Sequence, residues 1–147
     1  MTGPEIDHAE VYRQLPGPNV LLTPEFDVAD VNQAYLDATG RTREQLVGRN
    51  IFDAFPDNPA DPHARGIRAG SESMAKVLAT GEPDYLSFFK YDIEVPGSPG
   101  EYESHYWYVV NAPVVGPDGQ VVLIVHCAEE ITHRLHRFLA GLEEEHD

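Results

Sequence analysis

Two very short helices, placed one directly after the other, constrain the fold of this chain more than any other feature. The first is predicted to start after Asn32, whose side chain can accept a hydrogen bond from a free backbone N–H, and to stop at Gly40. In the second, Thr42 and Gln45 form the pattern of a capping box, and Gly48 ends the turn. Helices this short fill a core poorly, but they can enclose a small cavity against a sheet.

A longer helix is expected near the middle of the chain. Asp61 and Pro62 give a helix-start signal, because a capping residue is followed by proline at the first helical position. Gly66 and Gly70 weaken the segment that follows. We therefore expect regular helix only from about Ser71, with its apolar residues on one face.

The remaining segments predict an α+β fold. Apolar and polar residues alternate in stretches that are joined by turn sequences such as PGSPG and GPDG, which indicates antiparallel strands. We expect a five-stranded antiparallel sheet with short helices on one face, flanked by an N-terminal and a C-terminal helix. The other expected elements are a helix within 5–15, strands 19–23 and 28–31, a helical turn 51–55, and strands 85–95, 102–114 and 120–128. The expected organisation is an N-terminal helix in 1–16, one domain in 17–130 and a C-terminal helix in 131–147.

The composition excludes several classes of protein. The 147 residues are 41% apolar, enough for one globular domain, and the longest apolar run, Val121 to Val125, is too short to span a membrane. The formal net charge of −15 opposes binding to nucleic acid and to anionic lipid. A single cysteine, Cys127, excludes an internal disulfide, and the acidic N-terminus does not resemble a secretory signal. We therefore expect a cytoplasmic protein.

Two long motifs resemble the PAS domain, a sensory and dimerisation module of bacterial signalling proteins. The first motif is ADVNQAYLDATGRTREQLVGRNIFDAFPDNP, and the second runs from YLSFFKYDIEVPG to NAPVVGPDGQVVLIVHCAEEITHRL. Glu130-Ile131-Thr132 matches the exit tripeptide of the family, which usually begins with Asp. The resemblance covers about 15–135 and is to the class found at the front of bacterial histidine kinases and serine-phosphatase regulators. It implies a role in two-component signal transduction without enzymatic activity.

Single positions bear on the cofactors known in this superfamily. Its flavin-binding light sensors carry a cysteine directly after a Gly-Arg-Asn triplet, but here Asn50 is followed by Ile51, so a photoadduct is excluded there. His63 lies in the region from which haem-binding relatives supply an axial ligand, although its setting is a polar turn rather than a firm helix. We expect no bound cofactor, with a haem-dependent gas or redox sensor as the alternative.

No group of residues in the sequence predicts a metal site or an active site. His126 and Cys127 are neighbours on a strand and therefore face opposite sides of the sheet. His133 and His136 are three residues apart on a helix but lack a third ligand. Because HExxH, CxxC and GxSxG motifs are also missing, a small α+β enzyme is the least favoured interpretation.

The resemblance and the short helices together predict a pocket between the sheet and the helices. Its expected ligand is small and mainly apolar, and its identity is unknown. The candidate lining residues are Tyr35, Phe52, Phe55, Met74, Leu78, Tyr91, Val110 and Val125.

Aromatic residues occupy both faces of two predicted strands. On one strand Tyr85 and Phe89 share a face, and on the next Trp107 lies opposite Tyr106 and Tyr108. A sheet covered on one side should carry apolar residues on one face only. The second aromatic face therefore indicates either an interaction surface or local pairing of aromatic rings. We place Trp107 on this surface, partly exposed in a monomer and buried in a homodimer.

The C-terminal helix carries a short apolar seam formed by Leu135, Phe138 and Leu142, which have the spacing of a coiled coil. The seam is too short to dimerise alone, yet apolar enough to need a partner. Three partners remain open: the domain's own sheet, the same helix of a second chain, and an output domain. The favoured interpretation is a homodimer in which ligand binding shifts this helix between two packings.

Overall fold

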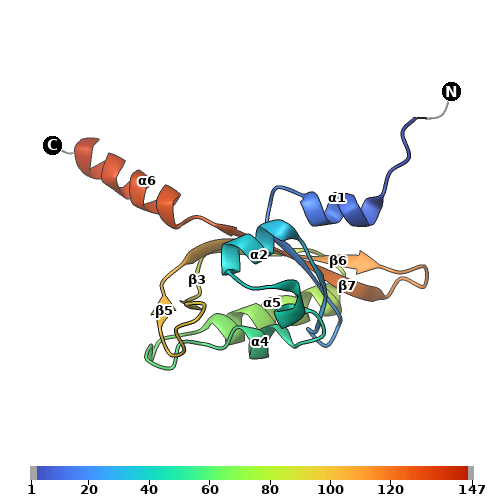
Figure 1. The fold of residues 1–147 in the computed structure, drawn as a ribbon, viewed down its shortest axis with the longest axis horizontal. Coiled ribbons are helices and arrows are strands. Elements are labelled where there is room, and N and C mark those ends of the chain that lie inside the picture. The colour runs from blue at the N-terminus through green and yellow to red at the C-terminus, as the bar shows by residue number, and fades with distance from the viewer. Residues whose placement is uncertain (1–2, 146–147) are drawn as a thin grey trace.

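The computed structural model describes residues 3–145 and has the α+β fold expected from the sequence (Figure 1). The main sheet has five antiparallel strands in the order β2-β1-β7-β6-β3, and a separate hairpin pairs β4 with β5. The strands are β1 (Asn19–Leu22), β2 (Val28–Val31), β3 (Asp84–Lys90), β4 (Ile93–Glu94), β5 (Tyr102–Glu103), β6 (Tyr106–Val115) and β7 (Val121–Glu130). The helices are α1 (His8–Gln14), α2 (Gln33–Thr39), α3 (Arg43–Leu46), α4 (Ile51–Ala54), α5 (Gly66–Thr80) and α6 (Thr132–Glu145).

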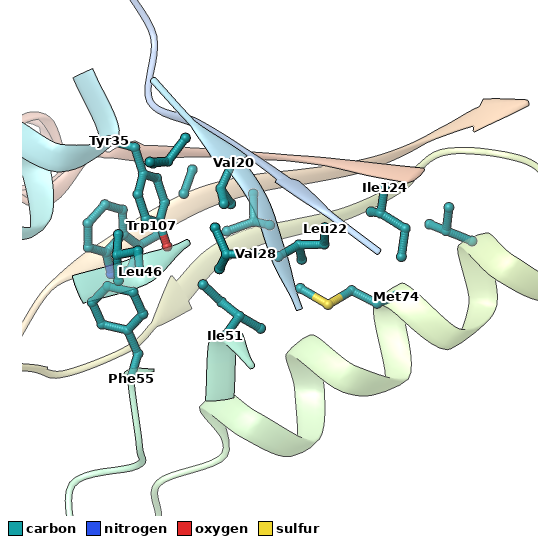
Figure 2. Packing of buried hydrophobic residues seen from close by; sticks show 14 residues of the cluster. Val20, Leu22, Val28, Tyr35, Leu46, Ile51, Phe55, Met74, Trp107 and Ile124 are labelled. Carbon is teal, nitrogen blue, oxygen red and sulfur yellow. The ribbon is translucent and has the colours of Figure 1, made fainter. Parts of the chain in front are cut away.

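The helices are divided between the two faces of the main sheet. In Figure 1, α4 and α5 lie below the sheet, whereas α1 and α6 lie above it and extend toward opposite sides of the molecule. The apolar core fills the space on the α4 and α5 side, where side chains from the sheet and the helices interdigitate (Figure 2). None of the helices in residues 3–145 is long and apolar enough to cross a membrane.

The two short helices have the predicted caps. The side chain of Asn32 accepts a hydrogen bond from the backbone N–H of Tyr35 at 3.0 Å, and Gly40 has the left-handed φ of 67°. Thr42 and Gln45 form both hydrogen bonds of the capping box. Asn32 also accepts from the backbone N–H of Asn19 on β1 at 2.9 Å, so the cap fastens α2 to the sheet. This attachment directs Tyr35 into the core.

The start of α5 was predicted wrongly. The helix begins at Gly66, whereas Asp61 and Pro62 belong to a preceding turn. A side chain at Gly66 would overlap the ring of Tyr91, and a Cβ at Gly70 would lie 3.3 Å from the ring of Phe52. The two glycines thus let aromatic rings approach the helix backbone. This packing outweighs their low helix propensity, which a prediction from propensity alone cannot take into account.

The strand predicted at 85–95 is broken in two. A β-bulge lies between Leu86 and Phe89, and Phe88 has a positive φ of 54°. Because the bulge reverses the alternation, Tyr85 is 58% exposed while Phe89 packs against the core, and the two do not share a face as predicted. After Lys90 the chain leaves the sheet and forms the small β4–β5 hairpin.

The C-terminal element of the structure is α6, within the segment predicted as helix in 131–147. The last two residues of that range lie outside the described part of the chain, as do the first two of the predicted N-terminal segment 1–16. Within 1–16 the structure has α1, which contributes no buried residue. Both terminal helices are therefore held by few contacts with the core.

Candidate functional site

A cavity of about 50 Å³ lies between the inner face of the sheet and helices α2, α4 and α5. A water molecule needs about 10–15 Å³ measured in this way, so the space holds a few waters or one very small molecule. Its wall is mainly apolar and is rich in aromatic rings. The aromatic lining residues are Tyr35, Phe52, Phe55, Phe89, Tyr91 and Trp107.

Hydrogen bonds and ring contacts hold this aromatic wall in place. The indole N–H of Trp107 donates to the backbone oxygen of Tyr91 at 3.1 Å, and the hydroxyl of Tyr91 donates to the backbone oxygen of Phe55. The rings of Tyr35 and Phe55 meet edge to face, with centroids 6.1 Å apart. Burial raises the pKa of Tyr35 and of Tyr91 far above the ordinary range, so both hydroxyls stay protonated.

The structure brings five of the eight predicted pocket residues to the cavity: Tyr35, Phe52, Phe55, Met74 and Tyr91. Leu78 packs against the core from α5 without lining the cavity.

Val110 and Val125 were placed on the wrong face of the sheet. Val109 on β6 and His126 on β7 both line the cavity, so their neighbours Val110 and Val125 point to the opposite face. Val110 and Val125 therefore belong to the outer face. Alternation around Trp107 separates the two faces of β6, but the aromatic residues on both faces did not show which face is the inner one.

Trp107 does not occupy the exposed position predicted for it. Its side chain is 4% exposed and lines the cavity, while Tyr108, on the opposite face of β6, is 38% exposed. The alternation was predicted correctly, but the wrong face was taken as the outer one. The exposed aromatic residues of the outer surface are instead Tyr85, Phe88 and Tyr108.

A chain of polar side chains crosses the inner face of the sheet and reaches the cavity. The Nδ1 atom of His126 lies 2.6 Å from Oδ1 of Asn111, and Nδ2 of Asn111 donates to Oγ of Ser73 at 2.9 Å. A hydrogen bond from Ser73 is the main cause of the lowered pKa of Asp84, which also pairs with Lys76 at 3.3 Å. Asn111 is fully buried, and burial lowers the pKa of His126 to about 4, so the imidazole is neutral at pH 7.

This polar chain was not predicted from the sequence. The available signal was Asn111, because alternation from Trp107 places this amide on the inner face among aliphatic residues. His126 and Cys127 do face opposite sides, as predicted. His126 lines the cavity, and the Sγ atom of Cys127 contacts Oδ1 of Asn19 at 2.7 Å.

The cavity does not fit the large cofactors considered from the sequence. Haem and flavin each need a pocket of several hundred Å³, far above the space present. His63 is exposed in the turn before α5 and does not line the cavity, and the buried side chain that follows Asn50 is Ile51. Among the side chains of residues 3–142, no three from His, Cys, Asp or Glu are grouped to hold a metal ion.

The C-terminal helix is joined to the cavity wall through β6 and β7. The backbone N–H of Ile131 donates to the backbone oxygen of Tyr106 at 2.8 Å, and the N–H of Tyr106 donates to Oγ1 of Thr132 at 3.0 Å. Beyond this junction the seam is largely uncovered in the described chain, because Phe138 is 64% exposed and Leu142 is 38% exposed. Leu135 is partly buried. The domain's own sheet does not cover the seam, which removes one of the three partners considered.

A family model for the PAS fold matches residues 12–136. The chain belongs to the PAS family. The fold order, the capped short helices and the helix that leaves after β7 agree with this assignment, which was expected from the sequence motifs. No curated protein sequence matches this PAS domain.

Solved structures with a similar fold include other PAS domains. A PAS domain from Colwellia psychrerythraea is 13% identical, with a TM-score of 0.64 over 86% of this chain and 95% of that one. The PAS domain of Bordetella pertussis BvgS is 25% identical, with a TM-score of 0.61 over 92% and 93%. VqmA bound to DPO is 18% identical, with a TM-score of 0.61 over 84% of this chain and 56% of VqmA. This chain thus spans little more than half of VqmA.

Proposed function

We propose that this PAS domain is a non-enzymatic, cytoplasmic sensory and dimerisation module that binds a small, mainly apolar ligand in the cavity. The observation that carries the proposal is the position of the aromatic cavity against the two strands that lead to α6. Trp107 on β6 and Ala128 on β7 line the cavity, and Tyr106, next to Trp107, holds the start of α6 through two hydrogen bonds.

The mechanism is a population shift. A ligand that prefers one arrangement of Trp107 and β7 changes the register or angle at the Tyr106–Thr132 junction, and α6 follows. The ligand can shift the equilibrium only by its difference in affinity for the two arrangements. A wall of large rings in contact with each other suits this role, because packed cores switch between discrete arrangements.

The comparison with VqmA supports ligand binding by a protein that contains this fold. That structure is described as bound to DPO, and this chain shares its fold at 18% identity. The likeness extends to the fold and not to the identity of the ligand. A haem-dependent sensor is the less favoured alternative, because His63 lies outside the cavity.

The proposed dimer uses α6 and the outer face of the sheet. Phe138, Leu139 and Leu142 leave an apolar strip on α6 that a second copy of the helix or an output domain would cover. The net charge of −15 argues against nucleic acid as a direct partner of this domain.

Benzene is the probe that tests ligand binding, because it is apolar and small. We expect its addition to shift the NMR signals of the Met74 methyl group and the Trp107 indole, and to change the amide exchange of α6. A matched pair of variants provides the control: Ala128→Leu fills the cavity and should abolish the response, whereas Ala112→Leu adds the same bulk on the outer face and should preserve it. A response that survives Ala128→Leu, or the lack of a response to benzene and to every other small ring tested, contradicts the proposal.

A further inference from the structure

His126 lines the cavity, and one of its ring nitrogens has no hydrogen-bond partner among the described side chains. Its Nδ1 atom is engaged with Asn111 on the neighbouring strand, and the two ring nitrogens point in divergent directions. Within residues 3–142, whose side chains the structure describes, no hydrogen bond to Nε2 is present. The imidazole also meets the ring of Tyr35 edge to face, with centroids 6.4 Å apart, which fixes its orientation.

The polar chain behind His126 determines which nitrogen carries the proton. Oγ of Ser73 accepts from the amide nitrogen of Asn111, and the ionised carboxylate of Asp84 at the far end leaves the hydroxyl proton of Ser73 an acceptor of its own. The amide oxygen of Asn111 then faces Nδ1 of His126, and an oxygen can only accept. Nδ1 must therefore donate, and in a neutral imidazole this leaves Nε2 as an acceptor without a proton.

Most other polar groups around the cavity are already used within the protein. The indole of Trp107, the hydroxyl of Tyr91 and the hydroxyl of Thr39 each donate to a backbone oxygen. The hydroxyl of Tyr35 has no partner among the described residues and can either donate or accept, so it selects no type of ligand. Figure 2 shows this ring extending from α2 toward Trp107. The acceptor on His126 is the group that does select.

We infer that the cavity is a site for a small planar ring that carries an N–H or O–H donor, and that this donor binds Nε2 of His126. The inference rests on the proposed function and specifies the class of ligand. The aromatic wall provides faces and edges for a flat molecule, and the single acceptor provides orientation. A ring without a donor leaves the acceptor buried and unpaired, which lowers its affinity.

The size of the cavity limits the ligand to a single small ring. At about 50 Å³ it is well below the roughly 150 Å³ of the engineered cavity that binds benzene in another protein. Binding of a ring thus requires movement of the aromatic wall, which the proposed function also requires. Pyrrole and furan are suitable probes, because both are five-membered rings of similar shape and only pyrrole has an N–H donor.

The tautomer can be tested without any ligand. In a sample labelled with nitrogen-15, we expect the imidazole of His126 to show a protonated Nδ1 and an unprotonated Nε2 at pH 7. Ser73→Ala removes the group that orients Asn111, so a larger fraction of the other tautomer should appear in that variant. A protonated Nε2 in the unmodified protein overturns the inference.

The ligand class is tested by titrating pyrrole and furan into the protein and following the Met74 and Trp107 signals. We expect pyrrole to bind roughly five- to tenfold more tightly than furan, the effect of one hydrogen bond. His126→Phe keeps a ring in place and should remove the preference, whereas His133→Phe, the same change at an exposed position on α6, should preserve it. Pyrrole should also shift the Nε2 signal of His126.

The two proposals fail in different ways. Equal binding of pyrrole and furan contradicts the donor inference and leaves the ligand-binding function intact. Failure of pyrrole to bind also contradicts the inference, while the benzene titration still tests the function. If benzene, furan and pyrrole all fail to bind, both proposals are wrong. The preference of the unmodified protein for pyrrole over furan tests the donor inference even if His126→Phe does not fold.

Discussion

At the scale of single residues, small side chains and buried polar groups shape the cavity as much as its aromatic rings do. Gly66 and Gly70 allow the rings of Tyr91 and Phe52 to reach the backbone of α5. Asn111 and Ser73 orient His126 from behind. Gly66, Gly70 and Asn111 are exceptions to local rules, because the two glycines lie within a helix and the amide lies in a buried strand. Such exceptions are where a functional site is expected.

Gly66→Ala should destabilise the domain, because the added methyl group would overlap Tyr91 and lie 2.9 Å from Oδ1 of Asp57. Overpacking of this kind costs about 1–3 kcal/mol in the free energy of unfolding. Gly141→Ala is the control: it lies in α6 with open space around it and should be neutral or stabilise by up to about 1 kcal/mol. Urea unfolding of both variants measures the difference. Equal stability of the two would show that Tyr91 gives way easily.

His126 should make stability depend on pH. Its pKa in the folded protein is about 4, below the ordinary value of 6.5, so the unfolded chain binds the proton more readily between these limits. This contribution is fully present above pH 6.5 and is lost as the pH falls to about 4, by on the order of 1–3 kcal/mol. Unfolding of the parent and of His126→Phe across this range isolates the effect, because the carboxylates titrate in both. Parallel curves would mean that His126 protonates freely in the fold.

At the scale of the elements, short-range signals predicted more than long-range packing did. The caps of α2 and α3 and the turn of the β6–β7 hairpin depend on residues close in sequence, and they were predicted correctly. The start of α5 depends on contacts with distant aromatic rings, and the bulge in β3 is a shift of register against β6; both were missed. The assignment of Trp107, Val110 and Val125 to the inner or outer face was wrong for the same reason. Alternation divides the side chains between two faces but does not show which face the helices cover.

Phe138→Asp on α6 should weaken self-association without loss of the sheet. The side chain is 64% exposed in the single chain, so the folded domain does not depend on it, whereas burial in a dimer would stabilise by about 1.5–3 kcal/mol. This corresponds to a change of roughly tenfold or more in the dissociation constant. His136→Asp on the same helix adds the same side chain away from the seam and serves as the control. Sedimentation measures association, and far-ultraviolet circular dichroism measures folding. An unchanged dimer places the contact elsewhere.

At the scale of the whole molecule, charge opposes the association that the apolar surfaces favour. The chain has 25 acidic and 10 basic residues, so two copies bring together a net charge of −30, twice the −15 of one chain. The apolar residues left exposed on the outer face and on α6 would have to overcome this repulsion. The balance between the two depends on salt, because exposed charges are screened over about 30 Å at 0.01 M salt and about 8 Å at 0.15 M.

Salt should therefore strengthen the proposed dimer. As the ionic strength rises from about 0.01 to about 0.15 M, the repulsion between the two chains is screened and the apolar contact is not weakened. We expect the dissociation constant from sedimentation to fall over this range. The fall should be smaller in a Glu44→Lys, Glu72→Lys double variant, in which two negative charges per chain are replaced by two positive ones at exposed sites on α3 and α5. A dimer that salt weakens would be held by ion pairs instead. In that case the apolar seam of α6 would be free to pair with an output domain, and Phe138→Asp would leave the dimer intact.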